Sequence, residues 1–324
     1  MKYTRAFVAA AASFAHYRRG AITFSSSSII EMQESSNPTI PELLRRARTL
    51  RNELYGKDIT KSSAATLPSF IYDSEQLAYP LSSYEMKIED DRRRITNRSV
   101  RRGFCNWLIP HKIMIGQYPG MTPEINGASS KECTIHIQNM IHHANINMFC
   151  CLQTEVPPQD DDFQWASGEV YLEPMSVRQE FPRPFTRYST LAQRALSDTS
   201  DDSSTICYHH SPIEDLSTPS CNDDLLYLLS TLLQHLESDT DNNILYLHCW
   251  GGRGRAGLIG GLMGSLLFPE LSSQEVLTWV QAGYDTRLGA ASMHPGLRRS
   301  PQTEQQRGFV REFVALVKDA HEKM

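Results

Sequence analysis

Apolar and polar positions along the chain predict a protein that mixes strands with helices. Short apolar runs rich in β-branched and aromatic residues are typical of buried strands. Such runs lie at 107–109, 113–115, 146–152, 170–172, 206–210 and 244–247. Apolar residues spaced three or four apart predict amphipathic helices, whereas a long apolar run predicts a buried one. Helices are expected at 38–56, 129–144, 187–196, 223–236, 258–267, 272–282 and from 309 onward.

The first 35 residues have a different pattern from the rest. They carry Lys and Arg with no acid before Glu31, a small apolar stretch at 6–15 and a serine run at 25–28. This composition fits a removable organelle-targeting segment, with the mitochondrion favoured over the plastid. The alternative is a disordered start without an address, in which case the protein is expected in the cytoplasm.

Residues 36–99 are expected to form a helix followed by a linker, and residues 100–324 the folded catalytic domain. Residues 57–90 show little periodicity and are the predicted linker. Six arginines crowd into 91–102. A solvated junction is favoured there over a basic rim that steers phosphorylated substrates or touches anionic lipid.

Composition excludes several classes of protein. The chain has 324 residues, of which 40% are hydrophobic, and a net charge of −5, so nucleic-acid binding is not expected. Seven cysteines without regular spacing do not resemble a disulfide framework or a zinc ligand set, which favours a reducing compartment. No apolar run is long enough to cross a bilayer. Nothing in the pattern indicates an oligomeric state.

One stretch, 248–257, carries candidate chemistry. Five residues, three of them glycine, separate Cys249 from Arg255, and the stretch joins a predicted strand to a predicted helix. Glycines let consecutive backbone N–H groups point inward, and these groups with the helix N-terminus make a cradle for phosphate. Arg255 can add a bidentate fork on two phosphate oxygens. The same positive field favours a Cys249 thiolate, a nucleophile placed to attack a bound phosphorus.

The stretch resembles a known signature. His-Cys-x-x-Gly-x-x-Arg is typical of the cysteine-dependent protein tyrosine and dual-specificity phosphatases, and His248, Cys249, Gly252 and Arg255 occupy its fixed positions. The resemblance implies an α/β fold with a central, mostly parallel sheet flanked by helices. It also implies that phosphate is bound by the loop residues and Arg255, without metal or cofactor. Those loop residues are Trp250, Gly251, Gly252, Arg253 and Gly254.

Two alternatives remain for this stretch. One is a glycine-rich turn around an inert, buried cysteine. The other is sulfur transfer by a thiolate loop of the rhodanese kind, against which the preceding His and the final Arg argue. A Walker-type nucleotide loop is excluded, because no Gly-Lys-Ser/Thr is present.

The resemblance extends to a general acid. The segment 209–219 has the form His-x-Pro-Ile-x-Asp followed by Pro, which is similar to the cyclin-dependent-kinase-inhibitor type of dual-specificity phosphatase. Asp215 is the matching aspartate. It would protonate the leaving oxygen and later deprotonate the attacking water. Glu214 is the competing candidate, and a turn or helix-cap role for Asp215 is the plain alternative.

Supporting residues follow from the same resemblance. His248 is expected to orient the loop through hydrogen bonds. Gln302 and Gln306 match two glutamines that position the hydrolytic water. Ala256 departs from the pattern, because Ser or Thr usually follows the Arg and its hydroxyl eases departure of the cysteine sulfur. Slower hydrolysis of the phospho-enzyme is therefore expected.

Together these features predict a phosphomonoester hydrolase that forms a phospho-cysteine and acts on phosphotyrosine and/or phosphoserine/threonine proteins. Arg253, a second positive charge in the loop, motivates phosphoinositides as an alternative substrate. Ala256 motivates a different alternative, a catalytically weak phosphate-binding pseudophosphatase.

Overall fold

The computed structural model describes residues 37–56, 67–89, 95–124, 126–172, 183–198, 205–293 and 298–324. The chain divides into two units, 1–36 and 37–324, and everything below concerns the second. The predicted targeting segment at 1–35 lies outside the described residues, so the expected localisation stays a prediction.

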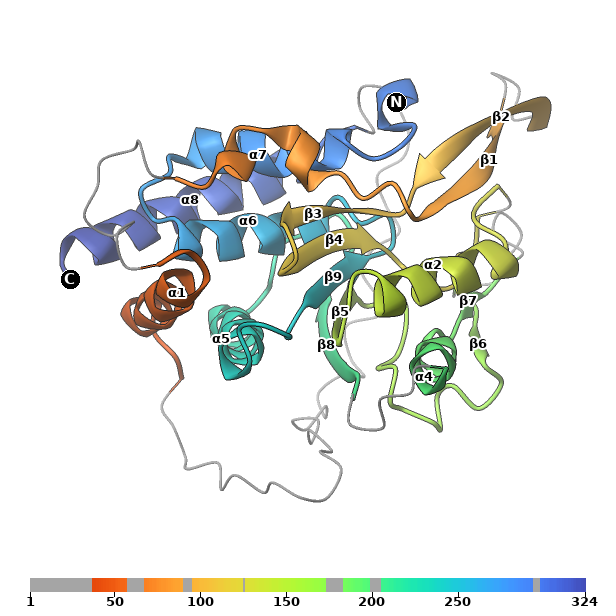
Figure 1. Cartoon of the computed structure of the whole chain (residues 1–324), viewed down its shortest axis with the longest axis horizontal. Coiled ribbons are helices and arrows are strands. Elements are labelled where there is room, and N and C mark those ends of the chain that lie inside the picture. Colours follow the sequence, from red (N-terminus) through yellow and green to blue (C-terminus); the bar gives the residue numbers. More distant parts are fainter. Residues whose placement is uncertain are drawn as a thin grey trace, which may run out of the picture. The chain divides into compact units, whose positions relative to one another are not determined.

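A five-stranded sheet forms the centre of this unit (Figure 1). Its strands run in the order β3, β4, β9, β5, β8, where β3 pairs antiparallel with β4 and the other neighbours are parallel. Their bounds are Cys105–Ile109, Ile113–Gln117, Leu245–Cys249, Met148–Gln153 and Cys207–Ile213, in the same order. The predicted α/β fold with a mostly parallel central sheet is confirmed.

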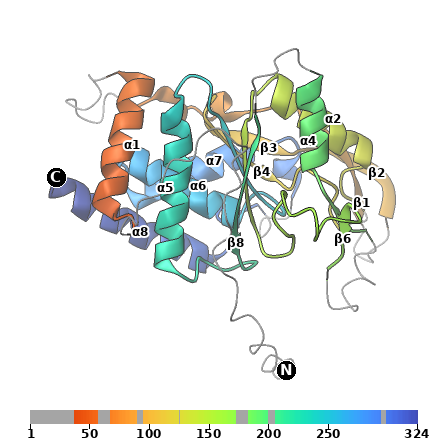
Figure 2. The same cartoon turned by 90° about the horizontal axis from the view of Figure 1, so that it is seen from below.

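Helices cover both faces of the sheet (Figures 1 and 2). On one face lie α2 (Ser130–His142) and α4 (Ser189–Ser197). The other face carries five helices: α1 (Ile40–Tyr55), α5 (Asn222–Ser238), α6 (Arg255–Leu267), α7 (Ser273–Asp285) and α8 (Glu304–Glu322). α6 lies against the sheet, and every one of its 13 residues is buried. The helix that follows the Cys-to-Arg stretch is therefore fixed within the core.

Local sequence signals explain where several helices begin. Ser129 and Glu132 form a capping box on α2, and Ser272 and Glu275 form one on α7. In such a box the two side chains satisfy each other's free backbone N–H groups at the helix start. The leucine stripe of α5 is buried, as its spacing predicts.

Two small antiparallel hairpins were not predicted as such. One pairs β1 (Ser83–Glu89) with β2 (Ile95–Gly103), and the other pairs β6 (Glu169–Val170) with β7 (Phe185–Thr186). The first hairpin occupies the end of the expected linker and most of the expected solvated junction. The stretch 95–103 holds three arginines and only two large apolar residues, so its pattern does not predict a buried strand.

The described part of the predicted linker is also structured. Phe70 is buried, and its ring packs against Phe268 and Trp279 with centroids 6.1 Å and 5.8 Å away. α1 contacts α5, α6 and α8, so the segment from 37 onward belongs to the same compact unit as the sheet. A few anchoring aromatic residues without periodicity hold this segment, which is why the sequence pattern suggested a linker.

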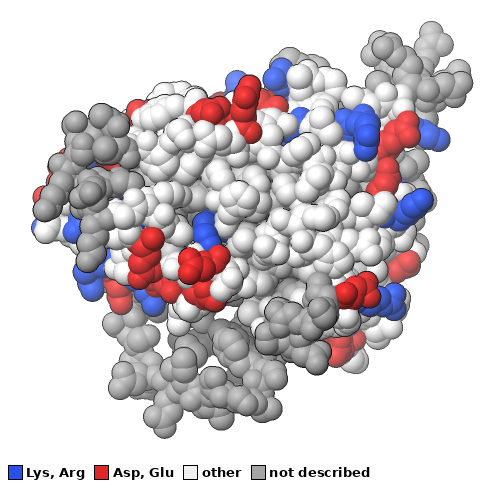
Figure 3. Space-filling view, viewed as in Figure 1, with Lys and Arg blue, Asp and Glu red and all other residues white. Residues whose placement is uncertain are grey.

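Charges are mixed over the surface in view. On the face shown in Figure 3, acidic and basic side chains of the described residues are scattered around the edge, while uncharged side chains cover the middle. Among the helices that the structure describes, none is long and apolar enough to span a membrane.

Candidate active site

The Cys-to-Arg stretch lies at the carboxyl end of the central strand. β9 ends at Cys249 and α6 begins at Arg255, so residues 249–255 form a strand-to-helix loop, called here the Cys–Arg loop. β9 is flanked on both sides by parallel strands, β4 and β5. In sheets of this type the carboxyl ends of the parallel strands form the usual site for ligands. The Cys249 residue is 3% exposed, so it is shielded at the base of the loop.

Arg287 holds the middle of the loop from outside. Its Nη2 donates to the carbonyl oxygen of Gly252 over 2.8 Å, and its Nη1 donates to that of Gly251 over 3.4 Å. The same guanidinium is fixed by hydrogen bonds to the carbonyl of Ile115, 2.9 Å, and to Oδ1 of Asn106, 2.8 Å. Arg287 is buried, and the sequence analysis missed it.

Two further contacts hold the carbonyls of Trp250 and Arg253, which flank Gly251 and Gly252. The backbone N–H of Tyr118 donates to the carbonyl of Trp250 over 3.0 Å. The hydroxyl of Ser300 donates to the carbonyl of Arg253 over 3.0 Å. Four consecutive carbonyls of the loop therefore point toward neighbouring elements.

The orientation of these carbonyls fixes the direction of the backbone N–H groups that follow them. In a planar trans peptide the C=O of one residue and the N–H of the next point in opposite directions. The N–H groups of residues 251–254 therefore point away from the elements that hold the carbonyls. Among the described residues, backbone–backbone hydrogen bonds from the N–H groups of Gly251, Gly252 and Gly254 are absent. A series of backbone N–H groups that face the same way is typical of an anion site.

Gly252 is required by the path of the loop. Its φ is +64°, in the left-handed region that L side chains rarely adopt. A Cβ at this position would lie 2.1 Å from the carbonyl carbon of Gly116 and 2.3 Å from the nitrogen of Gln117. The loop thus runs directly against the end of β4, which only a glycine permits.

Arg255 is held by a carboxylate that the sequence analysis also missed. Its Nη1 and Nη2 lie 2.7 Å and 2.9 Å from the two carboxylate oxygens of Glu155, and Nη1 also donates to the carbonyl of Ile213 over 3.1 Å. The Arg255 side chain is 1% exposed. This bidentate contact fixes the plane of the guanidinium.

Negative charge surrounds this guanidinium. Burial alone would lower the pKa of Arg255. The interactions with Cys249, Glu155 and Asp215 outweigh burial, so the pKa lies above its usual value. Arg255 is therefore permanently cationic. The predicted partners Cys249 and Arg255 lie together in the loop, as the motif requires.

Asp215 lies on the turn that follows β8. Its Oδ1 is 3.1 Å from Nη2 of Arg255, while its side chain is 55% exposed. The acid thus reaches the cradle from the solvent side. Ion pairs of Arg255 among the described residues are with Glu155 and Asp215, and Glu214 is exposed. This placement fits Asp215 better than Glu214, and its role as general acid stays a prediction.

Gln306 connects the loop of the candidate acid to the start of α8. Its side-chain amide nitrogen donates to the carbonyl of Ser217 over 2.9 Å, and its Oε1 accepts from the backbone N–H groups of Gln302 and Thr303. Gln306 is fully buried. A Cβ at Gly254 would lie 3.3 Å from the side-chain amides of both glutamines, so both lie next to the Cys–Arg loop. Their expected role in positioning the hydrolytic water stays a prediction.

His248 is enclosed behind the nucleophile. Its Nε2 lies 2.8 Å from the hydroxyl of Tyr188, and the residue has no exposed surface. Burial above all, and then the positive field of His210 and Arg255, hold the pKa of His248 well below its usual value. The expected role of His248 in orienting the loop through hydrogen bonds stays a prediction.

The chain was compared with known proteins. No family model matches this sequence, and a search of curated proteins gives no match. Structures similar to the chain include kinase associated phosphatase (KAP), with its catalytic cysteine substituted by serine. The two are 15% identical, the match covers 68% of this chain and 98% of that chain, and the TM-score is 0.41.

Two more similar structures match at comparable sequence identity and TM-score. PTPMT1 in complex with PI(5)P is 11% identical, with 65% of this chain and 95% of that chain covered and a TM-score of 0.38. The tandemly repeated protein tyrosine phosphatase like phytase from Mitsuokella multacida is 12% identical, with 66% and 39% covered and a TM-score of 0.42. At these identities and scores, the case for any chemistry rests on the loop residues described above.

Proposed function

We propose that this chain is a phosphomonoester hydrolase that works through a phospho-cysteine on Cys249. The observation that carries the proposal is that four consecutive loop carbonyls, those of residues 250–253, are hydrogen-bonded to neighbouring elements. The N–H groups that follow these carbonyls therefore face the other way, beside a buried cysteine and a fixed arginine. That combination suits a tetrahedral oxyanion, which accepts several hydrogen bonds at once. It has no evident use in a turn around an inert cysteine.

Substrate binding replaces one anion by another. The carboxylate of Asp215 lies against Nη2 of Arg255 and stands where an oxygen of a phosphate would be attracted. A bound phosphate carries more negative charge, accepts the loop amides as well and displaces this contact. Asp215 then remains at the mouth of the site, near the ester oxygen, because its turn is tied to α8 through Gln306 and Ser217.

The first chemical step transfers the phosphoryl group. Asp215 acts in its carboxylic acid form, having taken up a proton from solvent once phosphate has displaced it from Arg255. The Cys249 sulfur attacks phosphorus, the P–O bond to the leaving group breaks, and Asp215 gives its proton to the leaving oxygen. Arg255 and the amides of 251–254 hold the three equatorial oxygens, on which charge is spread in the transition state. Glu155 keeps Arg255 in the required plane.

The second step releases phosphate. Asp215, now a carboxylate, takes a proton from water, the water oxygen attacks phosphorus, and the P–S bond breaks to return the thiolate. Gln302 and Gln306, beside Gly254, are the candidates to orient this water. Ala256 offers no hydroxyl to the leaving sulfur, so this step is proposed to limit turnover.

Phosphorylated proteins are the proposed substrates, with phosphotyrosine and phosphoserine/threonine both included. Phosphoinositides are the second candidate, and the observation that favours them is Arg253, whose charge adds to that of Arg255 within one loop. A panel of phosphopeptides and phosphoinositides assayed for phosphate release separates the two. Release from the lipids alone would overturn the protein-phosphatase assignment.

Rapid quench in alkaline detergent, after mixing with a ³²P-labelled aryl phosphate, tests the mechanism. We expect a covalent phospho-enzyme in the wild type and none in Cys249→Ser. Cys221→Ser, which changes an exposed cysteine, is the matched control and should behave as the wild type. In Asp215→Asn, kcat/KM for phenyl phosphate should fall far more than kcat/KM for p-nitrophenyl phosphate, since the nitrophenolate leaving group needs little protonation. Full turnover by Cys249→Ser, or an equal loss from Glu214→Gln, would overturn these assignments.

A further inference from the structure

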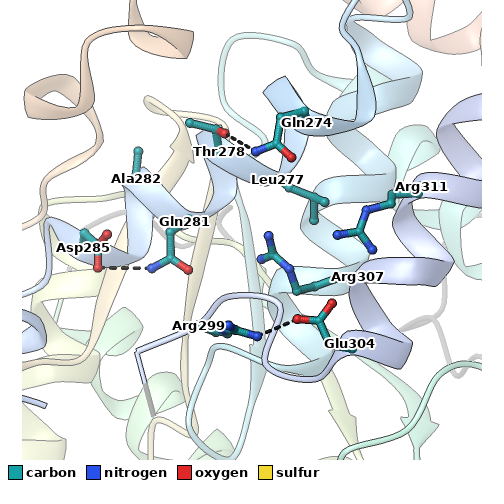
Figure 4. A pocket seen from close by; sticks show the side chains of 10 residues that line it. All are labelled: Gln274, Leu277, Thr278, Gln281, Ala282, Asp285, Arg299, Glu304, Arg307 and Arg311. Carbon is teal, nitrogen blue, oxygen red and sulfur yellow. Dashed lines mark hydrogen bonds and ion pairs between the residues drawn. The ribbon is translucent and has the colours of Figure 1, made fainter. Parts of the chain in front are cut away.

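A cavity lies between α7 and α8, apart from the Cys–Arg loop. It has a volume of about 420 Å³. Figure 4 shows Arg307 and Arg311 reaching from consecutive turns of α8 toward Leu277 on α7. Arg299, on the segment that leads into α8, contributes a third guanidinium. We call this cavity the α7–α8 pocket.

The acidic side chains around the pocket already have partners. Glu304 pairs with Arg299 over 2.5 Å. Asp285 pairs with Arg298 over 3.5 Å and accepts from the amide of Gln281 over 3.1 Å. Neither acid has a recorded contact with the two arginines of α8.

Arg307 and Arg311 are therefore left without an ion-pair partner among the described residues. No hydrogen bond or ion pair of either guanidinium is recorded among the residues that the structure describes. Burial lowers the pKa of Arg307, and the like charges of Arg311 and Arg299 lower it further against the opposing effect of Glu304. Like charges four residues apart on a helix repel each other. An anion between the two guanidiniums would remove this unfavourable arrangement.

The α7 wall opposite the arginines is polar, and its acidic lining residue, Asp285, is already paired. Gln274 and Thr278 present amide and hydroxyl groups from α7, and Leu277 beside them is buried. Arginines bind phosphate oxygens in a planar, bidentate fashion, while amides and hydroxyls pair with the hydroxyl groups of a polar ligand. We propose that the α7–α8 pocket binds a small phosphorylated polyol, such as a sugar phosphate, with its phosphate between Arg307 and Arg311.

The pocket is linked to the Cys–Arg loop by a short series of hydrogen bonds. The side chain of Gln281 donates to the carbonyl of Arg298 over 2.8 Å and accepts from the N–H of Ser300 over 2.9 Å. Ser300 in turn donates to the carbonyl of Arg253. Gln281 therefore supports the candidate active site as well as the pocket wall, so substitutions that test the pocket belong on α8.

Binding is tested on the full chain carrying Cys249→Ser, so that no ester is hydrolysed. The Nε–Hε NMR signals of Arg307 and Arg311 are assigned from single substitutions by glutamine and followed while glucose 6-phosphate is added. Both signals should shift and saturate. These signals report on the α7–α8 pocket alone, so the result is independent of whether the Cys–Arg loop binds phosphate or acts on it.

A double variant and a matched control complete the test. Arg307→Gln/Arg311→Gln should weaken pocket binding by at least about tenfold, the loss expected for two charge-assisted contacts. Arg45→Gln/Arg48→Gln changes a pair on α1, three residues apart, and should leave binding unchanged. Because Arg311 is exposed and Arg307 partly so, the double variant should melt at or above the temperature of the wild type.

Titrations with other phosphate compounds identify which class of ligand the pocket binds. Inorganic phosphate should bind more weakly than glucose 6-phosphate, because it has no hydroxyl groups beyond the phosphate to reach Gln274 and Thr278. Shifts that grow linearly without saturation, or that occur equally at Arg45, would overturn the proposal. So would phosphatidylinositol phosphate vesicles that bind through Arg307 and Arg311 while glucose 6-phosphate does not, since the ligand would then be a lipid headgroup.

Discussion

Arg287 and Gly252 are joined by a 2.8 Å hydrogen bond from the guanidinium to the glycine carbonyl, on the side of the Cys–Arg loop opposite the proposed phosphate site. The bond has two consequences. It turns the N–H of Arg253 inward, and it keeps the loop against Gly116, where a side chain at position 252 would collide. Arg287 is therefore a positioning residue, which acts on phosphate only through the loop amides.

Arg287→Lys should lower kcat/KM for p-nitrophenyl phosphate by about 100-fold, the scale at which small misplacements of a site reduce rates. Lysine keeps the charge but loses the planar fork that reaches Gly251, Gly252 and Ile115 together. Steady-state kinetics measure the loss, and Arg45→Lys on the exposed face of α1 is the control. A wild-type affinity for orthovanadate in Arg287→Lys would contradict the positioning role.

Glu155→Gln should raise KM by about tenfold and lower the free energy of unfolding by about 3 kcal/mol, because it leaves a buried guanidinium with a weaker partner. The two bonds from Glu155 fix the plane of Arg255, which Asp215 alone cannot do from one side. Kinetics and urea unfolding measure the two effects. The exposed Glu169→Gln serves as control. A variant that loses stability but keeps the wild-type KM would assign Glu155 to folding alone.

Ala256→Ser should increase steady-state turnover by about tenfold, the effect of one added hydrogen bond to a charged group. Ala256 follows Arg255 at the start of α6 and is fully buried. In the wild type we expect a burst of product followed by a slow phase, because hydrolysis of the phospho-cysteine limits turnover. Stopped-flow kinetics should show a faster slow phase in the variant and no burst when Cys249→Ser is added. An unchanged slow phase would mean that another step limits turnover.

Much of the core was predictable because its signals are local. The strand that ends at Cys249 and the helix that begins at Arg255 follow from an apolar run, a glycine-rich turn and a second apolar run. The Thr303 capping box is also a local signal, and it coincides with the predicted glutamine segment. Spacing within one short stretch was thus sufficient to locate the nucleophile and its arginine.

Residues that support the loop from far along the chain could not be found in this way. Glu155 is 100 positions from Arg255, and Arg287 is 35 positions from Gly252. Each lies in a segment whose composition looks ordinary, since a single charged residue in a loop or after a helix is usually solvated. Glu155 reaches the loop because β5 lies parallel to β9. Arg287 reaches it because the chain returns to the loop after α7. One partial signal was present: Glu155 comes two residues after a core strand, at the edge where sites form.

Acid should destabilise the protein through His235, near the end of α5. Burial lowers the pKa of His235 from 6.5 to about 4. Between these values the unfolded chain binds a proton that the folded chain does not, so stability present above pH 6.5 is lost as the pH falls toward 4. The loss from this residue is roughly 3 kcal/mol. His235→Gln keeps a donor for Oδ1 of Asn147 and removes the titrating group, so its free energy of unfolding should fall less steeply with acid. Urea unfolding across this pH range measures the slope. The exposed His143→Gln should keep the wild-type slope, and an identical slope in His235→Gln would refute the assignment.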